Sequence, residues 1–113
     1  MKYDLFKKFY DEAKDYNDVD MYIAERGWQD WMDKYSPTDD ASKVAEILTR
    51  IYNLSKLSIR YLRSMLGLSQ ISFYETYGIP RRTLQDWESG DNKVADYLVA
   101  LVAYTVFEGE ENE

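Results

Sequence analysis

The chain of 113 residues contains neither cysteine nor histidine. Without cysteine it can form no disulfide and no thiolate metal site, and it has no cysteine nucleophile. Without histidine it also lacks the commonest general base, so the usual zinc ligands are missing altogether. We therefore expect no enzymatic activity, no cofactor and no bound metal.

One acidic stretch comes nearest to a metal site. Asp15, Asn17, Asp18 and Asp20 lie close together, as residues of a calcium-binding loop do. The EF-hand pattern also needs a glycine at the sixth loop position and a suitably spaced glutamate, and this stretch has neither. We interpret it as a solvated loop.

Long apolar runs are absent as well. No stretch approaches the roughly 18 apolar residues that a membrane-spanning helix needs. The first residues, MKYDLFKKFYDEAK, are too polar for a secretory signal peptide. We expect a cytoplasmic protein that has no membrane partner.

The residues that are present favour helices along the whole chain. Hydrophobic residues make up 45% and aromatic residues 16%, which is enough for one compact domain or a small module with a helical extension. Apolar side chains recur at helical spacing, and no alternating strand pattern competes. The sequence therefore predicts an all-α protein with helices over about residues 3–14, 19–26, 41–54, 58–66, 70–77 and 80–89, and a last helix from about residue 92.

The stretch LGLSQISFYETYGIPRRTLQDWESG, residues 66–90, has the pattern of two short helices joined by a tight corner. Ser69 can cap a helix that runs from about Gln70. Gly78 can end that helix with a positive φ, and Pro80 is tolerated in a first helical turn but not later. Gly90 can close the second helix.

This pattern resembles the phage repressor and Cro type (XRE-like) of helix-turn-helix domain, which is widespread in bacterial and mobile-element regulators. The resemblance covers about residues 58–107. It implies that Gln70 contacts a phosphate and that Phe73, Ile79, Leu84 and Trp87 are buried. It also implies a recognition helix over about residues 80–89 that lies in the major groove. The residues expected to bind DNA are Ser69, Gln70, Arg81, Arg82, Gln85, Asp86 and Lys93.

Two consequences of the resemblance concern packing and assembly. Tyr74 stands where this family usually has alanine, so either its ring turns outward or the two helices cross further apart. The partner would be double-stranded DNA, and the two-fold symmetry that is typical of such regulators predicts a homodimer.

We expect one core that contains Phe73, Ile79, Leu84, Trp87, Leu98 and Leu101. In the last helix we expect a buried stripe made of Val94, Tyr97, Leu98, Leu101, Val102 and Thr105.

The segment SPTDD at residues 36–40 is the best internal boundary. It divides an acidic, aromatic-rich helical extension (1–40) from a helix-turn-helix domain (41–107), and residues 108–113 form an acidic tail. The net charge of −7 is unevenly distributed, because residues 56–93 carry six Lys/Arg against four Asp/Glu. The basic charge thus coincides with the motif.

Two functions from different classes remain open. In the first, the chain binds specific duplex sites and regulates transcription. In the second, the acidic, aromatic N-terminal half binds another protein, as an antitoxin or a phage-derived inhibitor of the anti-CRISPR or DNA-mimic kind would. Nine aromatic residues among the first 35 would complete the core or form that partner surface: Tyr3, Phe6, Phe9, Tyr10, Tyr16, Tyr22, Trp28, Trp31 and Tyr35.

Overall fold

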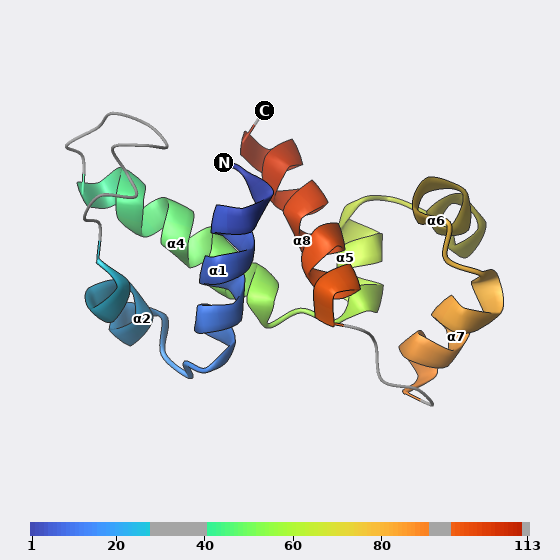
Figure 1. Ribbon diagram of the computed structural model, residues 1–113, viewed down its shortest axis with the longest axis horizontal. Helices are drawn as coiled ribbons and strands as arrows, with labels where there is room; N and C mark the ends of the chain where they lie inside the picture. The colour runs from blue at the N-terminus through green and yellow to red at the C-terminus, as the bar shows by residue number, and fades with distance from the viewer. Residues whose placement is uncertain (28–40, 91–95, 112–113) are drawn as a thin grey trace. The chain divides into compact units, whose positions relative to one another are not determined.

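The computed structural model describes residues 1–27, 41–90 and 96–111. Within these ranges every regular element is a helix, and no strand occurs. The helices are α1 (Tyr3–Lys14), α2 (Val19–Arg26), α4 (Ala41–Ser55), α5 (Ile59–Met65), α6 (Gln70–Tyr77), α7 (Arg81–Ser89) and α8 (Asp96–Glu111) (Figure 1). The predicted all-α class is confirmed. None of these helices is both long and apolar enough to cross a membrane.

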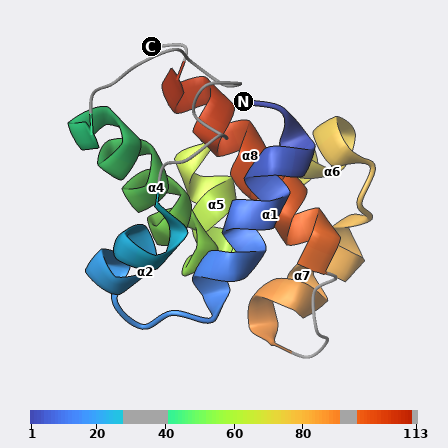
Figure 2. The same ribbon diagram turned by 60° about the vertical axis from the view of Figure 1, so that its left-hand side comes forward.

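The chain divides into two compact units, Met1–Lys56 and Leu57–Glu113. This division differs from the boundary expected near residue 40, because α4 belongs to the first unit. There it packs against α1 and α2, and Figure 1 shows α1 crossing α4 (Figure 2 gives a second view). The apolar face of α4 finds its partner among the N-terminal helices, which a local pattern does not reveal.

The first unit is built on two amphipathic helices. In α1 the buried residues are Phe6, Phe9, Tyr10 and Ala13, at the three- and four-residue spacing that the sequence predicts. In α4 the buried residues Val44, Ile47, Leu48, Ile51 and Leu54 recur at the same helical spacing. Lys56 closes the C-terminal end of α1, where its Nζ donates to the carbonyl oxygens of Ala13 at 3.0 Å and Tyr16 at 2.5 Å.

The N-terminal aromatic residues divide between the core and the surface. Phe6, Phe9, Tyr10 and Tyr22 are buried, which agrees with a role in completing the core. Tyr3 and Tyr16 are half-buried. Trp28, Trp31 and Tyr35 lie outside the described residues.

The second unit begins with three helices whose ends the sequence predicts well. Ser58 caps α5 and Ser69 caps α6 through their side-chain oxygens. Gly78 has φ 69° at the end of α6, and Gly90 has φ 84° at the end of α7. Both glycines thus adopt the left-handed conformation that an L side chain rarely tolerates. Pro80 precedes the first turn of α7 and is not part of it.

The expected single core of this unit is only partly correct. Phe73, Ile79 and Leu84 are buried, but Trp87 and Leu98 are half-buried. Leu101 is 40% exposed, so its placement in the core is wrong. The short helix α7 packs against α5 and α6. Leu84 is the residue of α7 that this packing buries completely.

The buried face of α8 also differs from the expected one. Tyr97 and Thr105 are exposed, and Val94 lies outside the described residues. Val102 is buried as expected, and the other buried residues are Ala100, Ala103, Val106 and Phe107. Apolar side chains occur all round this helix, so its sequence favours no single face. The buried side depends on the packing of the helix, which includes its contact with α5.

Leu84, which is buried, and Leu101, which is partly exposed, provide a test of the packing. Leu84→Ala is expected to lower the free energy of unfolding by about 2–5 kcal/mol, because it leaves a cavity at a fully buried site. Leu101→Ala removes the same atoms from a partly exposed site and should cost less than about 1 kcal/mol. Urea unfolding of both variants measures the difference. Equal losses would contradict the assignment of these faces.

Candidate nucleic-acid interface

Helices α6 and α7 meet at the corner that Gly78 makes possible. Ile79 precedes the N-cap residue of α7 and Leu84 is its fourth residue, the arrangement of a hydrophobic staple. Both side chains are buried. Phe73 of α6 is also fully buried, and its ring centroid lies 4.7 Å from that of Tyr77. With one side of α7 buried in this way, Arg81, Arg82 and Gln85 are exposed to solvent.

Gln70, in the first turn of α6, links this helix to the exposed side of α7. Its side-chain oxygen Oε1 accepts from Arg81 Nε and from Gln85 Nε2, each at 3.3 Å. Three residues that the sequence predicts as DNA contacts therefore lie together, although they come from two helices. They form a small polar cluster at the solvent-exposed surface.

Glu88 of α7 is not part of this exposed cluster but is held by Arg63 of α5. Arg63 Nε lies 2.8 Å from Glu88 Oε2, and Arg63 Nη2 lies 2.9 Å from Oε1. The side chains are only 16% and 9% exposed. The third arginine nitrogen, Nη1, donates to the Leu68 carbonyl oxygen at 2.8 Å. A two-point ion pair of this kind constrains how α7 lies on α5.

The ionisation of this pair follows from the contact. The Arg63 guanidinium holds the pKa of Glu88 below its ordinary value through its hydrogen bonds, and a hydrogen bond from Gln70 acts in the same direction. The same bonds to Glu88 raise the pKa of Arg63. Both groups are therefore charged at neutral pH. Gln70 also connects this ion pair to the exposed cluster.

The remaining predicted residues have different positions. Ser69 accepts from the backbone N–H of Ser72 at 3.1 Å, so its hydroxyl caps α6. Arg82 makes no hydrogen bond or ion pair within the part of the chain that the structure describes. Asp86 is half-buried. Lys93 lies outside the described residues.

Comparison of the chain with protein-family models, curated proteins and solved structures gave no match. Its function is therefore inferred from its residues and their geometry.

Two features bear on the sequence interpretation. Tyr74 is 47% exposed, so its ring turns outward and does not separate α6 from α7. The ion pair of Arg63 with Glu88 was not predicted, because 25 residues separate the two partners. The sequence signals that exist for it are an arginine in the last turn of one short helix and a glutamate near the end of another.

The exposed side of α7 is chemically suited to bind a polyanion. Guanidinium groups present several N–H donors in one plane, which match either phosphate oxygens or the N7 and O6 acceptors of guanine. A glutamine side chain can both donate and accept, as an adenine edge requires. Among the described residues, no group of three or more His, Cys, Asp or Glu side chains could hold a metal ion.

Proposed function

We propose that the chain binds double-stranded DNA at specific sequences and acts as a transcriptional regulator of the repressor type, without catalysis. The observation that supports this most directly is the cluster in which Gln70 joins Arg81 and Gln85 on the exposed side of α7. The clustered residues are those that the family resemblance assigns to DNA.

In this proposal α7 enters the major groove. Arg81 and Arg82 reach guanine edges, and Gln85 reads a neighbouring base. Gln70 and Ser69, at the start of α6, lie against the sugar-phosphate backbone and set the position of α7. The two arginines are the cations of α7, and Arg63 neutralises Glu88 at its other end. The positive charge is thus concentrated where bases would be read.

The charge of the chain sets the expected affinity. Its net charge of −7 disfavours non-specific association with phosphates, because each phosphate contact needs a cation. We therefore expect modest affinity that falls steeply with salt. A mobility-shift assay on pools of random duplexes, at low and moderate salt, tests this. Selective enrichment of one sequence supports the proposal, and the absence of any retarded species at low salt contradicts it.

Asp86 provides a sharper prediction within this proposal. If its carboxylate only repels phosphates, Asp86→Asn tightens binding to every duplex by a similar factor. If it instead accepts a hydrogen bond from a cytosine amino group, the same change weakens binding at the cognate site alone, by about 1–3 kcal/mol. Because Asp86 is half-buried, its carboxylate is less available to a base edge, and we expect the first outcome. Affinities for cognate and scrambled duplexes, measured by fluorescence anisotropy, distinguish the two.

A protein-binding role is the second candidate function. It is favoured by the surplus of acid in the N-terminal part, where residues 1–41 carry eleven Asp/Glu and six Lys/Arg. If the mobility-shift assay shows no binding, this becomes the leading proposal. Homodimer formation remains part of the DNA-binding proposal, and equilibrium sedimentation of the free and DNA-bound protein would measure it.

A further inference from the structure

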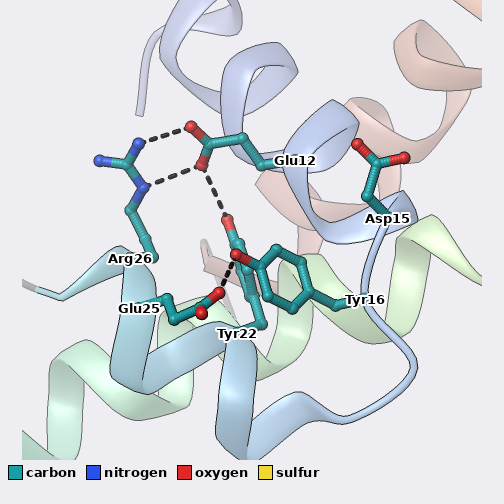
Figure 3. A pocket seen from close by; sticks show the side chains of 6 residues that line it. All are labelled: Glu12, Asp15, Tyr16, Tyr22, Glu25 and Arg26. Carbon is teal, nitrogen blue, oxygen red and sulfur yellow. Dashed lines mark hydrogen bonds and ion pairs between the residues drawn. The ribbon is translucent and has the colours of Figure 1, made fainter.

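Two hollows, one in each unit, differ in the chemistry of their walls. The hollow of the first unit, with a volume of about 460 Å³, is lined mainly by charged side chains, and its guanidinium, Arg26, already pairs with Glu12 (Figure 3). A hollow of about 360 Å³ in the second unit is mostly apolar and lies between the C-terminal parts of α5 and α8. It is lined by Met65, Leu66, Thr105, Val106, Gly109 and Glu110.

This apolar hollow lies at one end of an exposed row on α8. The row consists of Tyr97, Leu101, Thr105 and Gly109, which share one face because they are four residues apart. Tyr97 is 63% and Leu101 is 40% exposed. The Thr105 hydroxyl donates to the Leu101 carbonyl oxygen at 3.1 Å, so its polar group is satisfied within the helix. The α8 row is therefore largely apolar, with its largest side chain at one end and none at the other.

Gly109 is an independent sign that something approaches this face closely. A glycine within a helix destabilises it relative to alanine. Gly109 does not have the positive φ of the four other glycines, and a Cβ added to it would meet no atom within 4 Å. Neither its backbone conformation nor the packing of the described residues thus requires a glycine here. Close approach of another molecule would explain it.

A second copy of the chain carries the group that fits this face. When two α8 helices pack antiparallel about a two-fold axis near residue 103, position 97 of one copy lies opposite position 109 of the other, and 101 lies opposite 105. The large ring of Tyr97 then enters the partner's hollow where Gly109 has no side chain. The phenol hydroxyl reaches the rim of the hollow, where the Glu110 carboxylate is an acceptor.

Charge favours the antiparallel orientation. Glu108 and Glu110 lie in the last turns of α8, so a parallel pair would bring the carboxylates of both copies together. In the antiparallel pair they lie beside the start of the partner's helix, where the helix dipole is positive. The row is only about 18 Å long at 1.5 Å per residue. Because so short a contact gives a small interface, we expect a dimer Kd on the order of 10 µM.

We propose that the α8 row is the contact between two copies of this chain, with Tyr97 of each copy seated against Gly109 of the other. This assigns an interface to the homodimer that belongs to the DNA-binding proposal. The argument rests on α5 and α8 alone, and its test uses no DNA.

The test is sedimentation equilibrium of the full chain, which measures the dimer Kd. Tyr97→Ala removes the ring and Gly109→Gln fills its seat, so each should weaken the dimer about tenfold or more. Glutamine is a good helix former and meets open space at this position, so Gly109→Gln should not lower the thermal unfolding midpoint. The matched control, Tyr74→Ala, removes the same side chain from an exposed site on α6 and should leave the Kd unchanged.

A mixture of the two weakened variants provides a test that a loss of folding cannot imitate. A heterodimer of the Tyr97→Ala and Gly109→Gln chains keeps one intact contact, because the second chain still has its tyrosine and the first still has its glycine. This heterodimer should therefore form more tightly than the homodimer of either variant. Native mass spectrometry with one variant ¹⁵N-labelled distinguishes the three dimers.

Three results would overturn the inference. The first is a wild-type chain that stays monomeric up to about 1 mM, which would leave this face to a partner of another kind. The second is an equal loss of affinity in Tyr74→Ala and in the two row variants. The third is a mixture with no more heterodimer than random pairing gives. A dimer that Gly109→Gln weakens, in a chain that binds no duplex, would contradict the DNA-binding proposal alone.

Discussion

Replacement of Arg81 and Arg82 together by alanine is expected to abolish sequence-specific DNA binding with little change in the thermal unfolding midpoint. Each arginine that pairs with a guanine edge contributes about 1–3 kcal/mol of discrimination, so the loss should be at least about 30-fold in the Kd of the cognate site. Both arginine side chains are exposed and contribute little to packing, whereas Leu84 is the residue of α7 that is completely buried. Anisotropy titrations with cognate and scrambled duplexes provide the measurement.

The control for this variant removes equal charge elsewhere. Lys8 and Lys43 are exposed residues of the first unit, and their joint change to alanine also lowers the net charge by two. We expect this control to weaken cognate and scrambled duplexes to a similar, small extent. If the arginine variant keeps the wild-type site preference, α7 does not read the bases. Protein binding would then become the leading function.

Arg63→Ala, in contrast to the change of Arg81 and Arg82, is expected to lower the free energy of unfolding. It removes two bonds to Glu88 and one to the Leu68 carbonyl oxygen, and it leaves a mostly buried carboxylate without its partner. Breaking one side of such a pair costs about 2–4 kcal/mol in the free energy of unfolding, after allowance for the residual exposure of both groups. Arg60→Ala is the matched control, since Arg60 is an exposed arginine on the same helix, and should cost less than about 0.5 kcal/mol.

The same ion pair predicts a pH dependence with a definite sign. The folded state lowers the pKa of Glu88, so the stability that the charged carboxylate contributes is complete above its ordinary value of 4.5. It is lost as the pH falls through the lower pKa of the folded state, because the protonated acid no longer pairs with Arg63. The stability difference between the wild type and Glu88→Gln should therefore shrink as the pH decreases below about 4.5. Urea unfolding between about pH 3 and pH 7 measures it, and a constant difference over this range would contradict the role of the pair.

The features that the sequence predicts best are local ones. The ends of α6 follow from Ser69 and Gly78, since a cap and a positive φ involve only the nearest residues. The buried face of α1 follows from an apolar stripe at helical spacing, which leaves one side of that helix available for the core. Arg81, Arg82 and Gln85, which the family resemblance assigns to DNA contact, are exposed as such contacts require.

The features that the sequence could not supply depend on which elements meet. The buried face of α8 differs from the predicted one because this helix carries apolar side chains on all its sides. Its packing therefore decides that Phe107 is buried and that Leu101 is partly exposed. Helix α4 joins the first unit because its partner face lies on α1, a contact between segments about 40 residues apart. The pair of Arg63 with Glu88 arises in the same way. The sequence alone thus determined the helices and their ends through short-range capping and periodicity, whereas only the tertiary structure brought distant charged groups together, because those contacts form when the helices pack.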